Sequence, residues 1–333
     1  MYDKHLILDT SNATENLGDF IIMDAVRKQL RRMFPNDFFV YSTTHDSPGH
    51  KGFGWAEQAT LQFIGGSNLL SGRFIGRNRA QWRFGFRDTL HMNKLIGVGL
   101  GWQSDAEYKS LINVPLVYAQ KKLYKMGMSN NYIHSVRDSH TQKNLEKYGI
   151  KSINTACVTM WDLTAAHLSS IPKNKAKKVI TTITNYRKSD EHMAAYRSMI
   201  TTLLRLYDEV EMWIQTPGDL ELLAELNIKG SEAIKFINPN LEDYDRALEE
   251  NVDYVGTRLH AGIRALQHAK RTLIIEVDNR AREIAKDTNL PTLGYENIQS
   301  LEELLENELT MDVRVPFDQI ELWKNQFKAE MVN

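Results

Sequence analysis

The chain has 333 residues, a length that suits two domains of roughly 150 residues each. Lys and Arg total 41 and Asp and Glu total 42, so the formal net charge is −1, which argues against wholesale binding to nucleic acid or to an anionic membrane. The composition, with 42% hydrophobic and 25% charged residues, excludes disorder, collagen-like structure and coiled coil. The single cysteine, Cys157, excludes an intrachain disulfide and a cysteine-based zinc cluster.

Short apolar runs alternate with longer amphipathic stretches, the pattern of parallel sheets covered by helices. In the first half, the expected strands are residues 6–8, 38–41, 61–64, 95–98 and 132–136, and the middle three are expected to be buried, short and flanked by turn formers. The expected helices there are residues 18–33, 115–125 and 138–148, the last one ended by Gly149 at its C-cap.

Residues 172–178 are polar, basic and headed by a proline, which favours a linker; a solvated turn inside one domain is the alternative. After them the expected strands are residues 179–184, 210–215, 233–237, 254–255 and 272–277. The expected helices are residues 191–207, 219–226, 241–250 and 261–269. We therefore expect an α/β fold of two Rossmann-like domains facing a cleft, residues 1–171 and 172–315, with a helix in 316–333 that reaches back to the first domain.

No segment resembles a signal peptide, and the longest membrane candidate, residues 95–102, is far shorter than the ~20 residues of a membrane helix. We expect a cytoplasmic protein that is not integral to a membrane. Five arginines alternate with four aromatic residues in the segment 73–87, which could grip a phosphorylated or carrier-linked substrate or lie against acidic lipid headgroups. The alternative for this segment is an irregular loop with solvated arginines.

Ligands of open α/β sheets bind at the carboxyl ends of the strands, so residues directly after each expected strand are candidates. Asn16, Gly18 and Asp19 open the first helix, where capping by Asp19 is favoured over contact with a ligand. The strand at 61–64 is followed by Gly65, Gly66, Ser67 and Asn68. The two glycines could let backbone amides bind an anion or a sugar hydroxyl. The alternative is that the segment is a plain tight turn.

Charged residues follow two more strands. Ser135 and Arg137 end the strand at 132–136, where the arginine could hold a carboxylate or phosphate bidentately or pair with Asp138, the helix cap. After residues 254–255, Arg258 supplies a permanent cation and His260 a group that exchanges protons near neutral pH. If this segment is still extended, the intervening residue points into the core and Arg258 and His260 share one face. A structural histidine is the alternative.

Other catalytic templates find little support. Gly97, Gly99 and Gly101 resemble a dinucleotide fingerprint, but Trp102 stands where the third glycine should follow, so we expect no nicotinamide cofactor. The chain has no H-E-x-x-H, no G-x-S-x-G and no phosphate-loop motif, and we expect no metal site. Cys157 lies in an apolar run and is expected to be buried rather than nucleophilic.

Taken in order, these motifs resemble those of the polysaccharide pyruvyl transferase family. They are Asn16-Leu-Gly-Asp19, Gly65-Gly66, Gly99-Leu-Gly101, Ser135-Val-Arg-Asp138 and Gly256-Thr-Arg-Leu-His-Ala261, and Asp278-Asn-Arg280 is similar to the family's Asp-x-Lys. The resemblance covers residues 5 to 295, and Thr-Arg-Leu-His is its most specific motif. The chain departs from the family at Ser67, where a third glycine is common, and at Arg280, where lysine is usual.

The resemblance implies a GT-B-like fold and transfer of the pyruvyl group of phosphoenolpyruvate onto two hydroxyls of a sugar, forming a cyclic ketal in a capsule or exopolysaccharide. It implies that Ser135, Arg137, Arg258 and Arg280 bind this donor, with no further cofactor, and that His260 and Arg258 are catalytic. The candidate substrate-binding residues are Asn16, Asp19, Gly65, Gly66, Ser67 and Asn68.

The resemblance also implies that the first domain holds the acceptor and the second the donor. The acceptor is a saccharide that is free, polymeric or linked to a lipid carrier, and in the last case the protein would touch the inner face of the membrane peripherally. Two alternatives are a GT-B glycosyltransferase that uses a nucleotide sugar, and a catalytically silent subunit of glycan assembly.

Overall fold

The computed structural model describes residues 2–72, 81–103 and 113–328. Its contacts divide the chain into two units: unit 1 comprises Met1–Thr14, Ile22–Trp161 and Pro316–Asn333, and unit 2 comprises Glu15–Ile21 and Asp162–Val315. Residues 172–178 lie inside unit 2, where the carbonyl of Lys173 accepts hydrogen bonds from Arg271 Nε (2.9 Å) and from the amide of Leu309 (3.0 Å). The segment is therefore fastened to the body of unit 2.

Unit 1 is built on parallel strands. Its four-stranded sheet has the order β2-β1-β3-β4, and β5 and β6 form a second parallel pair. The bridge between Leu100 and Val136 joins the chain just after β4 to β5. The strands are β1 (Lys4–Asp9), β2 (Phe38–Thr43), β3 (Leu61–Gly65), β4 (Leu95–Val98), β5 (His134–Val136) and β6 (Ser152–Asn154). The helices are α1 (Leu17–Met33), α2 (Gly49–Gln58), α3 (Asn113–Gly127), α4 (Ser139–Tyr148) and α12 (Phe317–Asn325), with short 3₁₀ turns η1 (Asp88–Leu90) and η2 (Val158–Met160).

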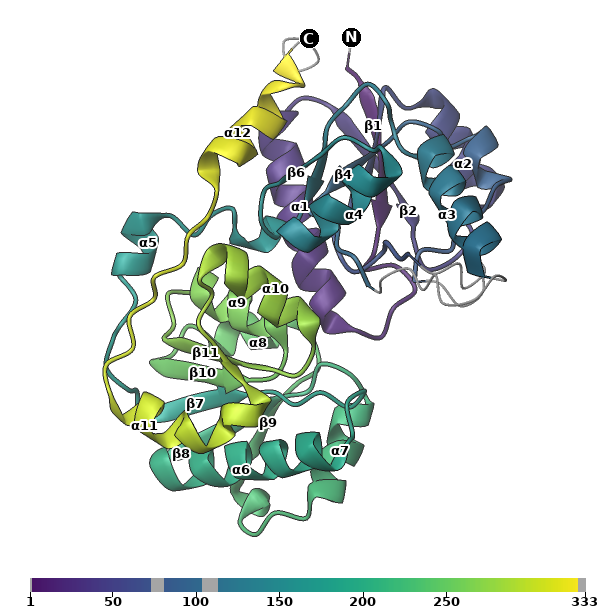
Figure 1. Cartoon of the computed structure of the whole chain (residues 1–333). Coiled ribbons are helices and arrows are strands. Elements are labelled where there is room, and N and C mark those ends of the chain that lie inside the picture. The colour runs from purple at the N-terminus through teal and green to yellow at the C-terminus, as the bar shows by residue number, and fades with distance from the viewer. Residues whose placement is uncertain (1, 73–80, 104–112, 329–333) are drawn as a thin grey trace. The chain divides into compact units, whose positions relative to one another are not determined.

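The core of unit 1 lies around β1, β3 and β4, whose apolar side chains are fully buried. The expectation of a buried strand at 38–41 was wrong, because β2 is an edge strand and its residues are partly or fully exposed. The C-terminal segment packs beside α1: the ring of Phe327 lies 6.0 Å from Phe34 and 5.7 Å from Phe63 (Figure 1).

Unit 2 is a doubly wound sheet with the strand order β12-β11-β10-β7-β8-β9, all parallel. The direction of winding reverses between β7 and β10, and ligands of such folds bind at the carboxyl ends of the strands near that switch point. The strands are β7 (Lys178–Thr181), β8 (Glu209–Trp213), β9 (Lys235–Ile237), β10 (Val252–Gly256), β11 (Thr272–Glu276) and β12 (Thr292–Gly294).

Helices cover both faces of the sheet of unit 2. In Figure 1, α6, α7 and α11 lie on one face, and α8, α9 and α10 lie on the other. Their bounds are α5 (Ala165–Ser169), α6 (Asp190–Leu206), α7 (Gly218–Leu226), α8 (Leu241–Ala247), α9 (Leu259–Gln267), α10 (Asn279–Thr288) and α11 (Leu301–Glu306). Two 3₁₀ turns, η3 (Ser231–Ala233) and η4 (Tyr295–Ser300), complete the unit.

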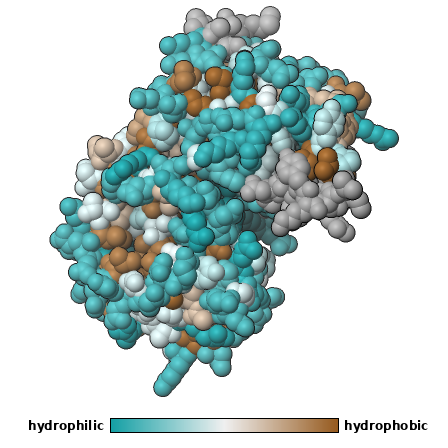
Figure 2. All heavy atoms as spheres, viewed as in Figure 1, coloured by the Kyte–Doolittle hydropathy of each residue, from teal (hydrophilic) through white to brown (hydrophobic). Residues whose placement is uncertain are grey.

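Among the residues that the structure describes, no helix combines the length and the apolar character needed to cross a bilayer. The face drawn in Figure 2 is mostly hydrophilic and carries separate, smaller apolar areas.

Candidate active site

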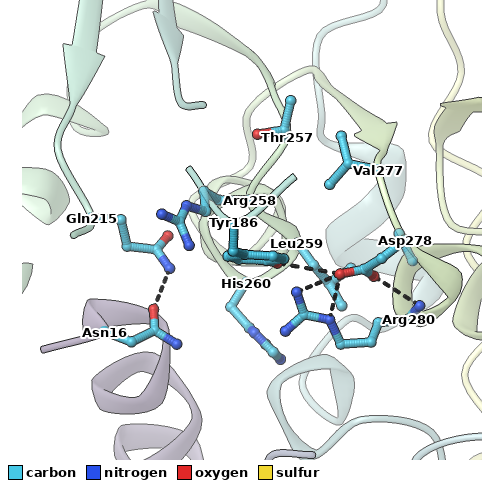
Figure 3. Close-up of a pocket in the computed structure, with 11 residues that line it drawn as sticks. Asn16, Tyr186, Gln215, Thr257, Arg258, Leu259, His260, Val277, Asp278 and Arg280 are labelled. Atoms are coloured by element: carbon cyan, nitrogen blue, oxygen red, sulfur yellow. Dashed lines mark hydrogen bonds and ion pairs between the residues drawn. The ribbon is translucent and has the colours of Figure 1, made fainter. Parts of the chain in front are cut away.

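A pocket opens at the carboxyl edge of the sheet of unit 2, beside the switch point (Figure 3). Its walls come from the segments that follow β7, β8, β10 and β11, together with the residue that precedes α1. The lining residues are Asn16, Tyr186, Gln215, Thr257, Arg258, Leu259, His260, Val277, Asp278, Arg280 and Ala281. Four of them, Asn16, Arg258, His260 and Arg280, were candidate site residues from the sequence.

The backbone after β10 lies very close to the backbone after β7. A Cβ on Gly256 would lie 2.5 Å from Thr182 Oγ1 and 2.7 Å from the Thr182 amide nitrogen, so only glycine allows this approach. The amide of Thr257 then donates to the Thr182 carbonyl (3.0 Å), and the Thr184 and Thr257 hydroxyls are hydrogen-bonded (2.8 Å). The start of α9 is thereby fixed at the switch point.

Arg258 occupies the N-cap position of α9 and is 4% exposed. Its Nε donates to the Ile183 carbonyl (2.9 Å), and its Nη2 donates to Thr216 Oγ1 (2.9 Å) and Asp219 Oδ1 (2.5 Å). These partners come from the segments after β7 and β8, so one guanidinium joins three neighbouring strand ends. Its remaining nitrogen, Nη1, carries two further N–H donors.

The aromatic ring of Tyr186 is approached by two guanidinium groups of the pocket. The Cζ of Arg258 lies 5.5 Å and the Cζ of Arg280 lies 5.2 Å from the ring centre, both within cation–π range. The Tyr186 hydroxyl donates to Asp278 Oδ2 (3.2 Å), which also accepts from Arg280 Nε (2.8 Å). Tyr186 therefore holds two cations in a fixed arrangement at the pocket (Figure 3).

His260 lies in the first turn of α9 and lines the same pocket, with 9% of its surface exposed. The expected reason for its placement was wrong: the helix already begins at Leu259, so the alternation of an extended segment does not apply, and Leu259 itself lines the pocket. The first amides of a helix have no intrahelical acceptor, so those of α9 present a partial positive charge next to Arg258.

Asn16 reaches the pocket from the start of α1. Its Oδ1 accepts hydrogen bonds from the amide of Gly18 (3.1 Å) and from Gln215 Nε2 (2.7 Å), and the amide of Leu17 donates to the Gln215 carbonyl (3.2 Å). The cap of α1 is therefore Asn16, which corrects the preference for Asp19. Asp19 is 6% exposed and contacts Asn16 Nδ2 (3.3 Å).

The glycine-rich turn expected near β3 lies in unit 1 and does not line this pocket. Gly65 ends β3, the Gly66 amide donates to the Val98 carbonyl (2.8 Å), and the Ser67 carbonyl accepts from the Gly101 amide (2.9 Å). Ser67 has a φ of +76°, the left-handed region that glycine adopts most readily. The chain thus places a serine in a backbone conformation that glycine adopts with less strain.

Arg137 and Ser135 also lie in unit 1, and both are buried. Arg137 Nη2 donates to Asn68 Oδ1 (2.7 Å) and Nε to Asp138 Oδ2 (3.3 Å); its guanidinium fills the space that a side chain at Gly101 would need. The Ser135 hydroxyl accepts from the Gly99 amide (2.8 Å). The structure therefore does not bring these two residues into the pocket with Arg258, and their contact with the donor stays a prediction.

Three other expectations can be compared with the structure. Cys157 is 2% exposed, as expected, and burial raises the pKa of its thiol. Asp138 caps α4, accepting from the Thr141 amide (2.6 Å), as expected. In the arginine-rich segment, Trp82 and Phe84 are buried and stacked (4.5 Å between ring centres), so neither faces a membrane; residues 73–80 of that segment lie outside the described residues.

Three residues of the site, Tyr186, Gln215 and Asp219, were not predicted from the sequence. Tyr186 and Gln215 follow strands, so the rule that found Arg258 could have found them. Asp219 accepts from the Thr216 amide (3.0 Å) and hydroxyl (2.9 Å), and Thr216-Pro-Gly-Asp219 is a capping pattern before an apolar run. Asp219 also pairs with Arg258, which lies 39 residues away, and no local sequence pattern indicates this contact.

Solved structures with similar folds share little sequence with the chain. The S. aureus MnaA structure with UDP is 11% identical, covers 100% of this chain and 97% of its own, and has a TM-score of 0.52. The UDP-N-acetylglucosamine 2-epimerase of Rickettsia bellii is 12% identical, covers 100% and 96%, and also has a TM-score of 0.52. With the parallel sheets of both units, they confirm the expected α/β, GT-B-like fold class.

A search of curated proteins found no match. A family model does match, and it spans residues 16–279, from the cap of α1 to the start of α10. This range includes the Gly65-Gly66 turn, Arg137 and the pocket residues Arg258 and His260. Its description is polysaccharide pyruvyl transferase, and the chain belongs to that family.

Proposed function

We propose that the protein transfers the pyruvyl group of phosphoenolpyruvate onto two hydroxyls of a saccharide, forming a cyclic ketal in a cell-surface polysaccharide or its precursor. One observation carries the proposal: Arg258 and Arg280 lie against the same Tyr186 ring in a pocket that His260 also lines, in a chain of the polysaccharide pyruvyl transferase family. Phosphoenolpyruvate carries a phosphate and a carboxylate, which require two cationic partners.

The pocket offers three sources of positive potential for such a donor. The contacts that fix the Arg258 guanidinium are made by Nε and Nη2, and Nη1 carries two further N–H groups that can bind an anion. Arg280 is held by Asp278 but keeps 24% of its side chain exposed. The start of α9, whose first amides have no acceptor within the helix, adds the positive end of the dipole of a nine-residue helix. Arginine at 280 gives a planar, bidentate donor where lysine would give a single ammonium.

The chemistry requires one proton-transferring group and firm anion binding. A proton is added to the methylene carbon C3, and the oxocarbenium-like C2 is attacked by a first sugar hydroxyl, which releases its own proton. The C2–O bond to phosphate then breaks, and a second hydroxyl attacks C2 and loses its proton. The products are the ketal and inorganic phosphate, and the two released protons restore the acid and accompany the phosphate. His260 is our candidate for the acid and base, and Arg258 stabilises the departing phosphate.

Thermal melting tests the donor. We expect phosphoenolpyruvate to raise the melting temperature of the wild-type protein and to have little effect on Arg258→Ala. Arg264→Ala is the matched control: Arg264 lies on the same helix, pairs with Asp245 (2.7 Å) and does not line the pocket, so this variant should respond like wild type. If phosphoenolpyruvate raised the melting temperature of Arg258→Ala as much as that of the wild type, the proposed donor site would be contradicted.

A nucleotide-sugar glycosyltransferase is the alternative that the same experiment separates. UDP and UDP-N-acetylglucosamine are the probes. Under our proposal, neither should raise the melting temperature of the wild type more than that of Arg258→Ala. A shift with these nucleotides and none with phosphoenolpyruvate would replace the proposal by the glycosyltransferase.

A further inference from the structure

Two contacting elements of unit 1, η1 and α3, carry several exposed apolar side chains. They lie on η1, on the residues just before it and on α3; together with Arg87, Lys122 and Lys125 we call this surface the α3 face. Its apolar members are Phe86, Leu90, Val114, Leu116, Tyr118 and Met126. Leu90 is 75% and Tyr118 is 68% exposed. Scattered exposed apolar residues are ordinary, whereas a cluster marks an interaction surface.

Packing beneath the α3 face explains why these side chains point outward. Trp82 stacks on Phe84 (4.5 Å between ring centres) and on Tyr124 of α3 (5.8 Å). A Cβ on Gly127 would lie 2.4 Å from the Phe84 ring, so this glycine lets the segment before η1 lie close against α3, and η1 itself also contacts α3. The inner side chains of both segments are used in the core, which leaves the outer ones to solvent.

The spacing on α3 gives the outer side a regular stripe. Val114, Tyr118, Lys122 and Met126 follow one another at intervals of four residues and are all exposed, and Lys125 lies beside them. An apolar stripe with a tyrosine and lysines is the pattern of helices that lie in the headgroup region of a bilayer, where the lysine stems cover apolar surface and their ammonium groups reach phosphates.

Among the described residues near the stripe, basic side chains outnumber acidic ones. Residues 81–103 and 113–128 contain one acidic residue, Asp88, which is buried and accepts from the Gly85 amide (2.8 Å). The same residues contain six basic side chains, Arg83, Arg87, Lys94, Lys121, Lys122 and Lys125. Within the described part of the chain, no ion pair involves the basic members of the α3 face, and Glu57 of the neighbouring α2 pairs with His91 (2.5 Å). Lysine is depleted at the centres of protein–protein interfaces, so this composition favours a lipid surface.

We propose that the α3 face docks on an anionic bilayer surface, with Leu90 and Tyr118 among the headgroups and Lys122 and Lys125 against lipid phosphates. The inference is independent of the donor chemistry. It moves the membrane contact from the segment expected in the sequence to η1 and α3, because Trp82 and Phe84 of that segment are part of the core.

Sedimentation with lipid vesicles tests the proposal. The full-length protein should bind vesicles of phosphatidylcholine mixed with phosphatidylglycerol, bind pure phosphatidylcholine weakly, and lose binding as salt is added. Neutralising a lysine near an anionic surface weakens binding roughly fivefold, so Lys122→Gln with Lys125→Gln should weaken it on the order of twentyfold. Leu90→Ser with Tyr118→Ser should also reduce it. All four positions are exposed, and the melting temperature should stay unchanged.

The matched controls lie in unit 2. Lys229→Gln and Phe236→Ser change an exposed lysine and a 53% exposed phenylalanine, and neither should alter vesicle binding. Equal binding to neutral and anionic vesicles, or full binding by the α3-face variants, would overturn the proposal. So would light scattering that detects dimers which Leu90→Ser with Tyr118→Ser dissociates, because the face would then belong to a second copy of the chain.

Discussion

Unit 2 contains two buried arginine–aspartate pairs at opposite edges of one parallel sheet. Arg258 and Asp219 follow β10 and β8 at the carboxyl edge, while Arg271 precedes β11 and Asp253 lies near the start of β10 at the amino edge. All four side chains are at most 4% exposed. Burial and pairing therefore do not distinguish a candidate active-site arginine from a structural one.

The two pairs differ in what else each guanidinium contacts. Arg271 donates to the carbonyls of Lys173 (2.9 Å), Leu305 (2.8 Å) and Asn307 (2.9 Å), which joins the loops that enter and leave the sheet. Arg258 contacts the Ile183 carbonyl and the Tyr186 ring and lines a pocket. In a parallel sheet the amino edge can be closed by such contacts, whereas the carboxyl edge keeps helix N-termini and backbone amides for a ligand.

His260 gives the largest expected effect at the carboxyl edge. His260→Ala should lower turnover by roughly 10²–10⁴-fold, the usual loss when an acid–base group is removed, while phosphoenolpyruvate still raises the melting temperature. The measurement is phosphate release from phosphoenolpyruvate in the presence of a saccharide that the wild type uses. Full activity in this variant would remove His260 from the mechanism.

His268→Ala is the control for that experiment. His268 directly follows the same helix and lies 3.3 Å from Asp245 on the far end from the pocket. If His268→Ala lost as much turnover as His260→Ala, replacing either histidine would disturb α9, and the effect of His260→Ala would be structural.

Arg271 gives the next largest effect, on stability. Arg271→Met leaves Asp253 buried beside the Tyr207 hydroxyl without its cation and should lower the free energy of unfolding by about 3–5 kcal/mol. Adding Asp253→Leu should restore most of this loss, because the uncompensated charge is then gone as well. Urea unfolding of the two variants checks this, and a double variant that is less stable than Arg271→Met would contradict the account.

Tyr186 gives a smaller effect, on donor affinity alone. Tyr186→Leu removes a ring that faces two guanidinium groups. Each cation–π interaction contributes about 0.5–1 kcal/mol, so the variant should bind phosphoenolpyruvate roughly tenfold more weakly. Tyr186→Phe keeps the ring and should bind nearly as well as wild type. Titration calorimetry separates the two, and equal losses would assign the effect to the hydroxyl and Asp278 instead.

The sequence predicts the alternation of strands and helices because buried strands and amphipathic helices repeat with clear periods. It misses α2, whose ten residues include three glycines, and the three-residue strands β6 and β12, which are too short to show a period. It also misses α10: Asp278 was noted for the similarity of Asp278-Asn-Arg280 to the family's Asp-x-Lys, whereas its Oδ1 caps the helix by accepting from the Arg280 amide (2.9 Å).

The site was predictable where its residues follow strands directly, as Arg258, His260 and Arg280 do. Asn16 was also found, although its contact with Gln215 joins residues 199 positions apart. The partnership of Arg258 with Asp219 and Tyr186 could not be predicted, because it depends on the spatial order of β8, β7 and β10. The same holds for Arg271, whose partners besides Asp253 are carbonyls with no side-chain signature.

The smallest effect concerns pH at the amino edge. Glu209 begins β8 and accepts from Lys178 Nζ (2.8 Å) and Lys235 Nζ (2.6 Å), and these ammonium groups lower the pKa of its carboxyl to about 2. As the pH falls below the ordinary value near 4.5, the unfolded chain takes up this proton first. The stabilisation is therefore complete above about pH 4.5 and is lost as the pH falls towards 2.

Because a third of the Glu209 side chain is exposed, solvent screens the pair, and we expect the loss to be no more than about 1 kcal/mol. Urea unfolding of the wild type and of Glu209→Gln near neutral pH and at about pH 3 measures it, and the difference between the two proteins should shrink in acid. Glu232→Gln, an exposed position in η3, is the control and should show no such change. A difference that stays constant with pH would mean that the network at the amino edge stabilises through packing and that its charges add nothing.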